Sequence, residues 1–227
     1  MLVRRPAGGK LHGMPTGKFA NAIRDHANRF LLRLGAPRDF AIVSNNCWGA
    51  GFYSDLGRAY NTPFVGTMVP PRCYLDLLAG FPECLDQPLR FLPKSRYTTW
   101  EIRCPVATLG DSEIHFMHYK SEDEAREKWT RRLARFPRDP ALWRFKFCDH
   151  HVGPEPESSQ FLAEFDALPF ASKVCFLGRR EPSLACGVVL PECLDAGRVM
   201  DGHALYRVSL RRFHARAWLA GGAPRRP

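Results

Sequence analysis

The stretch Phe40-Ala-Ile-Val-Ser-Asn-Asn-Cys-Trp-Gly49 carries the strongest structural signal in the sequence. Its first four residues are apolar and partly β-branched, which predicts a short buried strand. The strand stops at Ser44, two asparagines and Cys47, and two glycines then turn the chain toward a helical segment. Ligands bind at the carboxyl ends of strands in open α/β sheets, so this turn is a candidate site. A polar turn with a buried cysteine is the alternative.

Strands and helices alternate along the rest of the chain. Apolar runs predict strands near residues 64–69, 97–106, 113–119, 144–149, 173–177 and 184–190. Helical patterns cover residues 18–34, 74–78, 121–136, 160–168 and 206–219. This order predicts an α/β fold, three-layered and Rossmann-like or SGNH-like, with a mostly parallel sheet and helices on both faces. We expect a flexible basic N-terminus over 1–16, a single domain over 17–220 and a disordered tail over 221–227.

Composition limits the class of protein and its partners. The 227 residues carry 33 Lys and Arg against 23 Asp and Glu, a net charge of +10 that favours anionic partners such as a nucleotide-linked or lipid-linked sugar precursor or a glycan. The basic residues are dispersed and form no recognition motif, which argues against nucleic acid. No run reaches the roughly 18 apolar residues of a membrane span, and no signal peptide is recognisable.

We therefore expect a cytoplasmic protein. Its eight cysteines form no C-x-x-C pair and are interpreted as reduced thiols. The basic segment 18–34 either packs on the domain or rests peripherally on an anionic membrane, such as the inner membrane, or on polysaccharide-assembly machinery.

Three predicted strand ends carry groups that suit a nucleophilic mechanism. Cys47 or Ser44 would be the nucleophile, because a thiol at a strand-to-helix turn can have a lowered pKa. His115 and His118 point to opposite faces of one strand, and either could be the general base. Asp149 would orient that histidine, or would cap a turn. Taken singly, each histidine is more often a hydrogen-bonded core residue.

Other polar residues near these strand ends would bind substrate. Amide side chains can donate hydrogen bonds to an oxyanion, and a lysine at a helix entrance can bind phosphate. The predicted substrate-binding residues are Asn45, Asn46, Trp48, Gly49, Asn61 and Lys120. A metal site from Asp149, His150 and a strand histidine matches no known ligand spacing, so we expect no metal. We expect no tightly bound cofactor either, since G-x-G-x-x-G and P-loop motifs are absent.

Six segments between Phe40 and Leu190 resemble a bacterial family. The segments are Ser44-Asn-Asn-Cys-Trp-Gly49, Tyr60-Asn-Thr-Pro-Phe64, Glu113-Ile-His-Phe-Met-His-Tyr-Lys-Ser-Glu122, Lys146-Phe-Cys-Asp149, Phe165-Asp-Ala-Leu-Pro169 and Lys173-Val-Cys-Phe176. They resemble the exopolysaccharide-biosynthesis-associated family called domain of unknown function nineteen-nineteen. The resemblance implies an α/β domain and a role near capsule, exopolysaccharide or lipopolysaccharide assembly, but no particular reaction.

A second resemblance concerns mechanism. Asn46-Cys47 is similar to the Asn-Cys pair that follows the first strand in coenzyme-A-binding capsule acetyltransferase-like proteins, which implies acetyl-CoA as donor. SGNH-type enzymes place their nucleophile at the same point, although their Gly-Asp-Ser block and late Asp-x-x-His pair are missing here. The leading hypothesis is an acetyltransferase acting on a cell-surface glycan or its precursor. The alternatives are a glycosyl- or phospho-sugar transferase, for which Asp111-Ser-Glu113 would be the acidic motif, and a non-catalytic assembly factor.

Overall fold

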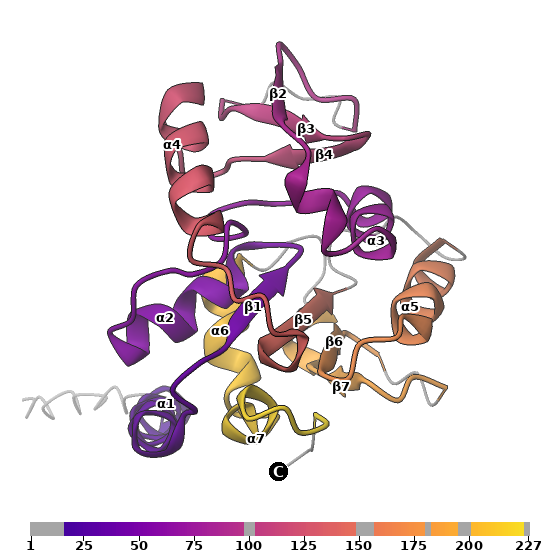
Figure 1. The fold of residues 1–227 in the computed structure, drawn as a ribbon. Helices are drawn as coiled ribbons and strands as arrows, with labels where there is room; N and C mark the ends of the chain where they lie inside the picture. Colours follow the sequence, from indigo (N-terminus) through magenta and orange to yellow (C-terminus); the bar gives the residue numbers. More distant parts are fainter. Residues whose placement is uncertain (1–15, 98–102, 149–156, 180–182, 195–200, 225–227) are drawn as a thin grey trace, which may run out of the picture.

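A four-stranded parallel sheet lies at the centre of the protein (Figure 1). The computed structural model describes residues 16–97, 103–148, 157–179, 183–194 and 201–224. The strands lie in the order β1 (Ala41–Ser44), β5 (Trp143–Cys148), β6 (Lys173–Leu177) and β7 (Gly187–Val189). Val43 lies opposite Phe145, and Phe145 lies opposite Lys173. The strands are apolar runs because helices cover both faces of the sheet. The predicted α/β fold and mostly parallel sheet are confirmed.

Two groups of helices cover the two faces (Figure 1). Helices α3 (Pro71–Ala79) and α5 (Glu157–Ala167) pack with Phe145 and Phe147 of β5. On the other face, Val174 and Phe176 of β6 pack with helices α1 (Thr16–Gly35), α2 (Ala50–Leu56), α6 (Gly202–Ser209) and α7 (Ala215–Leu219). Alternate residues of each strand point to opposite faces, so one strand serves both cores.

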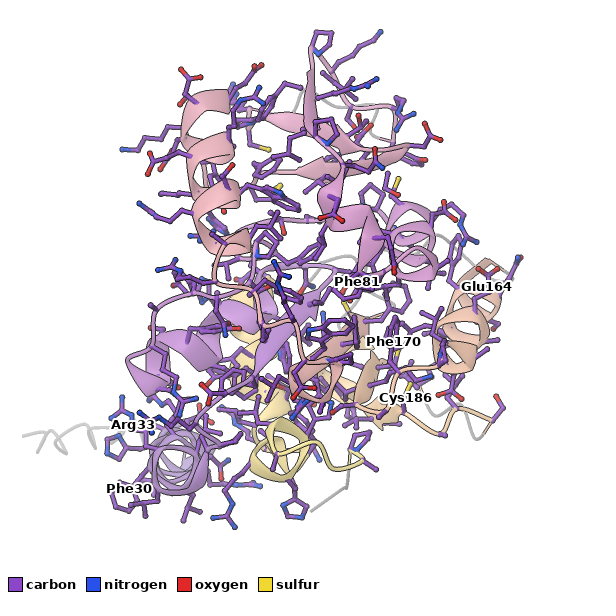
Figure 2. All side chains as sticks on the ribbon, viewed as in Figure 1. Phe30, Arg33, Phe81, Glu164, Phe170 and Cys186 are labelled. Atoms are coloured by element: carbon purple, nitrogen blue, oxygen red, sulfur yellow. The ribbon has the colours of Figure 1, made fainter. Side chains whose placement is uncertain are left out.

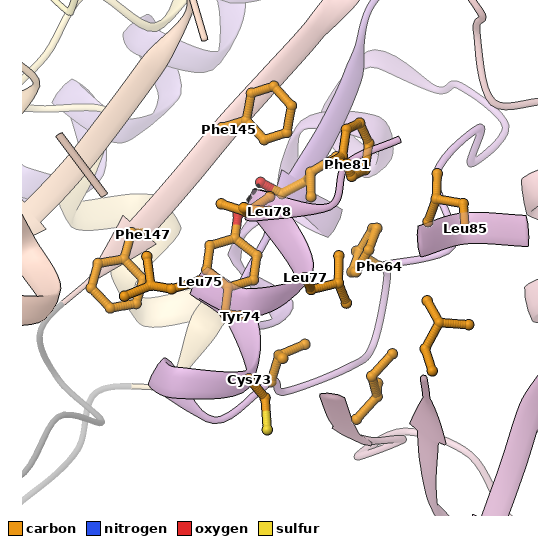
Figure 3. Packing of buried hydrophobic residues seen from close by; sticks show 14 of the residues in the cluster. Phe64, Cys73, Tyr74, Leu75, Leu77, Leu78, Phe81, Leu85, Phe145 and Phe147 are labelled. Carbon is orange, nitrogen blue, oxygen red and sulfur yellow. Dashed lines mark hydrogen bonds between the residues drawn. The ribbon is translucent and has the colours of Figure 1, made fainter. Parts of the chain in front are cut away.

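Helix α3 is tied to the sheet by an aromatic residue (Figure 3). The hydroxyl of Tyr74 donates a hydrogen bond to the carbonyl of Val43 at 2.9 Å. Its ring stacks on Phe147, with 5.9 Å between centroids. Figure 3 also shows Phe64 and Phe81 packed in this cluster. The phenol fills apolar space while its oxygen satisfies the strand carbonyl, which is how a buried Tyr is normally accommodated.

A second, antiparallel sheet is inserted between β1 and β5. It consists of β2 (Leu89–Leu92), β3 (Val106–Leu109) and β4 (Ser112–His115), in that order. Gly110, at φ +60°, allows the tight turn that folds β4 back on β3. The strands expected near residues 97–106 and 113–119 therefore do not join the parallel sheet, although residues 98–102 lie outside the described residues. The strand expected at 64–69 is reduced to one bridge between Met68 and His115.

Helix α4 (Glu122–Leu133) packs beside the second sheet (Figure 1). The hydroxyl of Ser121 accepts a hydrogen bond from the Glu124 amide at 3.2 Å, which is one half of a capping box. The Glu124 carboxylate accepts one from the backbone of Lys120 at 2.6 Å. The buried side of α4 carries Trp129 and, unexpectedly, the charged residue Arg132.

The carboxyl-terminal region forms two helices, α6 and α7, rather than one over residues 206–219. The Ser209 hydroxyl donates to the Tyr206 carbonyl at 2.8 Å and accepts from the Trp48 indole at 2.9 Å. Such back-bonding competes with the helical ladder and helps to end the helix. Beyond α7, the Gly221 amide bonds to the Trp218 carbonyl at 2.9 Å.

Among the helices within the described ranges, none is both long and apolar enough to cross a membrane.

Candidate functional site

The turn after β1 places Cys47 at the carboxyl end of the parallel sheet. The Asn46 side chain caps a short 3-10 helix, η1 (Cys47–Gly49), by accepting a hydrogen bond from the Trp48 amide at 3.2 Å. This helix runs directly into α2. A β-carbon on Gly49 would lie 2.8 Å from Cγ2 of Ile42, so glycine lets the turn fold closely onto β1. The predicted strand-to-helix turn is confirmed.

Cys47 and His118 form a close pair. Sγ of Cys47 lies 3.1 Å from Nε2 of His118 and 3.6 Å from the carbonyl oxygen of Thr67. His118 is exposed and follows β4, where its amide donates to the Gly66 carbonyl at 3.3 Å. Gly66 has φ +75°, a conformation that glycine adopts without strain. A thiol within reach of an imidazole is the arrangement of a nucleophile and its general base.

The Cys47 thiol is protonated at neutral pH. Its pKa is raised to about 11, mainly by burial and to a smaller extent by Asp201, while the nearby Lys146 and a backbone hydrogen bond oppose the rise. The lowered thiol pKa expected at this turn is therefore not found, because loss of water outweighs the favourable groups. A neutral thiol needs a base, and Nε2 of His118 is placed to accept its proton.

A pocket of about 180 Å³ opens beside this pair. Four parts of the chain meet around it, namely the turn that bears Cys47, the 60–66 loop, α4 with the residues before it, and the start of α6. The last of these contributes His203, whose ring centroid lies 6.4 Å from that of His118. Helix α4 contributes Lys128 and Arg132 to the wall.

The two asparagines hold β1 to β5. Nζ of the fully buried Lys146 donates to Oδ1 of Asn45 at 3.1 Å and of Asn46 at 2.9 Å. Their amide nitrogens face Sγ of Cys148 at 3.8 and 3.3 Å. The ammonium also lies 5.8 Å from the Trp48 ring. The amide side chains that we predicted to stabilise an oxyanion thus accept hydrogen bonds from the buried Lys146 ammonium.

Several other predicted residues have structural partners. Ser44 is buried and accepts a hydrogen bond from the Asn46 amide at 3.4 Å. Trp48 is buried among aromatic rings. Asn61 donates to the Phe40 carbonyl at 2.8 Å and accepts from Tyr53 at 2.7 Å. The Lys120 side chain is exposed where α4 begins.

His115 belongs to a separate buried cluster in the second sheet. Its Nε2 lies 2.6 Å from Glu113 Oε1, and both side chains are fully buried. The same nitrogen is 3.1 Å from Ser95 Oγ, which also bonds to Glu113. The strand expected to carry both histidines ends at His115, and His118 lies in the turn that follows it, so strand alternation does not separate them. Only His118 contacts Cys47.

Asp149, His150 and His151 lie outside the described residues. Within the ranges that are described, no three His, Cys, Asp or Glu side chains are grouped as metal ligands would be. The roles predicted for Asp149 stay predictions.

Sequence reasoning missed the basic groups around Cys47. Lys146 interrupts the apolar run Trp143–Cys148, and a lysine in a strand buried on both faces was a usable signal. Arg132 continues the apolar side of α4 begun by Ala125 and Trp129, at helical spacing. His203 carried no signal, because only the packing of α6 brings it near His118.

Comparisons with known proteins identify relatives without a described activity. The family described as "Domain of unknown function (DUF1919)" matches residues 19–213. A Haemophilus influenzae protein described as "Uncharacterized protein" is 36% identical over 173 residues, which cover 74% of this chain and 78% of that protein. The family match spans all four parts of the chain that line the pocket.

Proposed function

Because this chain belongs to the DUF1919 family, whose description names no reaction, we propose its activity from the site itself: thiol-dependent acyl transfer to a cell-surface glycan or its precursor. The observation that carries the proposal is the 3.1 Å approach of Cys47 Sγ to His118 Nε2 at the mouth of a small pocket. Nucleophile and base within hydrogen-bond reach are the minimum that covalent acyl transfer needs.

In the first step, His118 Nε2 takes the thiol proton while Cys47 Sγ attacks the carbonyl carbon of a donor thioester. The bond from that carbon to the donor sulfur breaks, and the leaving thiolate receives the proton from His118. Cys47 then carries the acyl group. In the second step, an acceptor hydroxyl gives its proton to His118 and attacks the same carbonyl, and the Cys47 sulfur leaves and is reprotonated.

The surroundings of the pair support this class of reaction. A pocket of about 180 Å³ suits a small acyl group such as acetyl. Acetyl-CoA is the proposed donor, and its phosphates suit a chain of net charge +10. The glycan acceptor rests on the family resemblance of the sequence. The proposed setting is the cytoplasm, in keeping with the free thiol of Cys47.

Intact-mass analysis after incubation with acetyl-CoA tests the proposal. We expect an acetyl adduct on the wild type that is absent from Cys47→Ala. His118→Ala should form it about 10²- to 10⁴-fold more slowly, the usual loss when a general base is removed. Ser44→Ala is the matched control and should keep the adduct. An adduct that persists in Cys47→Ala would contradict the proposal.

A further inference from the structure

The pocket beside Cys47 is rich in basic side chains. Among its described lining residues are Lys128, Arg132, His118 and His203, and none of those lining residues is acidic. The nearest carboxylate on α4, Glu124, is bound to Lys128 at 2.5 Å. Asp201, which acts on Cys47 at longer range, accepts a hydrogen bond from the Ala204 amide at 2.8 Å.

Arg132 is fixed in the pocket wall and has an unused donor. The residue is 6% exposed. Its Nη1 donates to the Val65 carbonyl at 2.9 Å and to the Tyr119 hydroxyl. The guanidinium lies 4.9 Å from the Tyr60 ring centroid. Its Nε is buried and has no hydrogen-bond partner among the described residues. An unpaired donor on a buried cation is costly, so an acceptor that reaches it would be stabilised.

We propose that this pocket binds an anionic group, a carboxylate or a phosphate, of the molecule that reacts at Cys47. Arg132 and Lys128 would hold the anion by charge-assisted hydrogen bonds, as guanidinium and ammonium groups do. The proposal rests on the proposed function for the role of Cys47. It adds the substrate class, because a neutral acyl group alone would leave the Arg132 guanidinium without an anionic partner and its Nε donor unused.

Alkylation of the full-length protein with a charged and a neutral reagent tests the site. Iodoacetate and iodoacetamide form the same bond with sulfur but differ in charge. Cys84 is an internal reference, since Glu83 and Asp86 surround it with negative charge. Peptide mapping should give an iodoacetate-to-iodoacetamide rate ratio at Cys47 roughly tenfold or more above that at Cys84.

Variants of the two cations identify the cause of this preference. Lys128→Gln and Arg132→Lys should lower the ratio at Cys47. Lys128 is partly exposed, so its variant should fold even if Arg132→Lys does not. Lys94→Gln, at an exposed lysine that does not line the pocket, is the matched control and should leave the ratio unchanged. Protection of Cys47 by inorganic phosphate or by acetate then distinguishes a phosphate ligand from a carboxylate.

The outcomes separate this proposal from the proposed function. Rapid labelling of Cys47 by iodoacetamide without a preference for iodoacetate overturns the anion site and leaves the nucleophile intact. A Cys47 that reacts with neither reagent overturns both.

A different observation concerns α1, which exposes an apolar stripe. Ile23, Phe30, Leu31 and Leu34 are 54%, 57%, 54% and 67% exposed. Their spacing places them on one side of the helix. Figure 2 shows Phe30 at the outer side of α1. The opposite side packs on the protein, where Leu32 is buried.

Arginines lie next to this stripe. A hollow of about 390 Å³ between α1 and α7 is lined by Leu31 of the stripe and by Arg24, Arg211 and Arg216. Of these, Arg211 is paired with Asp25 at 2.5 Å. Apolar side chains flanked by arginines are the pattern of helices that lie in a membrane interface. We infer that α1 docks on an anionic phospholipid surface, with the stripe among acyl chains and the arginines at the phosphates.

Co-sedimentation of the full-length protein with vesicles tests this docking. We expect binding to vesicles of phosphatidylcholine mixed with phosphatidylglycerol, much weaker binding to phosphatidylcholine alone, and release by salt. Phe30→Ser with Leu34→Ser should abolish binding, and Met117→Ser, an exposed apolar residue elsewhere, should not. Binding that survives the double substitution overturns the inference. The inference is also overturned if the wild type is a dimer that the same two substitutions dissociate, because the stripe would then join two copies of the protein.

Discussion

Gly202 lies directly against Cys47. A β-carbon on Gly202 would be 2.9 Å from Cβ of Cys47 and 2.7 Å from the backbone nitrogen of Trp48. Both distances are too short for carbon, and the second involves backbone that cannot rotate away. The start of α6, with His203, can therefore approach Cys47 only because residue 202 has no side chain.

Gly202→Ala should consequently destabilise the protein and displace His203 from the pocket. Overpacking of this kind costs about 1–3 kcal/mol, which thermal or urea denaturation would measure. Gly80→Ala is the matched control, because its β-carbon would meet nothing closer than 4.0 Å. Equal stability of Gly202→Ala and wild type would show that α6 does not approach so closely.

Asn46→Ala should lower the free energy of unfolding more than Asn45→Ala. Asn46 caps η1 and binds Lys146 at 2.9 Å, whereas Asn45 binds Lys146 at 3.1 Å without a cap. Losing a cap and a hydrogen bond to a buried charge costs about 2–4 kcal/mol, and losing only the latter costs about 1.5–3 kcal/mol. Urea denaturation measures both. If both variants are fully stable and only acyl transfer falls, the amides act on substrate instead.

Glu113 should support stability in mild acid. Burial alone would raise its pKa, but hydrogen bonds from Ser95, the Arg96 backbone and His115 outweigh burial and hold the pKa below its usual range. The folded-state pKa is thus below the unfolded one, so this contribution is present above about pH 4.3 and is lost as pH falls through the folded pKa.

Denaturation of Glu113→Gln between pH 5 and the acid transition checks this. The variant should be less stable than wild type near neutrality and should lose less stability on acidification. Glu127→Gln, an exposed member of an ion pair with Arg131, is the control. Parallel pH profiles for wild type and Glu113→Gln would contradict the assignment.

The reactivity of Cys47 should keep rising into alkaline pH. With its pKa raised to about 11, the thiolate fraction grows until well above pH 9, whereas an unperturbed thiol, with a pKa of about 8.5, levels off earlier. Iodoacetamide labelling of Cys47 as a function of pH, with a small peptide thiol as reference, makes the measurement. A rate already constant near pH 7 would instead indicate a preformed thiolate and imidazolium pair.

The strands of the central sheet were predictable because each one can be recognised from its own short segment of sequence. Strands such as Lys173–Leu177 are short apolar runs between helical patterns, and burial on both faces requires that composition. The second sheet was not predictable from the sequence. Its pairing depends on the turn at Gly110 and on the register between β3 and β4, and an apolar run alone does not indicate which strand it pairs with. The single helix expected over residues 206–219 is divided into α6 and α7 near Ser209, which makes a long-range contact with Trp48 that the local pattern does not indicate.

The site was predictable only in part. The strand-to-helix turn located Cys47, but the separation of His115 from His118 follows from the end of β4 at His115 and not from strand alternation. The contact between His118 and the thiol depends on the loop at Gly66, whose carbonyl accepts a hydrogen bond from the His118 amide. Gly66 is distant in sequence from His118, so the sequence pattern did not indicate this contact. Arg132 and His203 enter the pocket through packing of whole helices, which composition does not encode.

The wide separation of the pocket residues along the chain has a consequence during synthesis. Cys47 leaves the ribosome long before His118, and His203 emerges later still. A nascent chain therefore exposes an ordinary cysteine with no base beside it and no cationic pocket around it. The cluster around Cys47 is completed only when α6 docks, so a translation product truncated before α6 would carry the Cys47 thiol without all of the side chains that surround it in the folded protein.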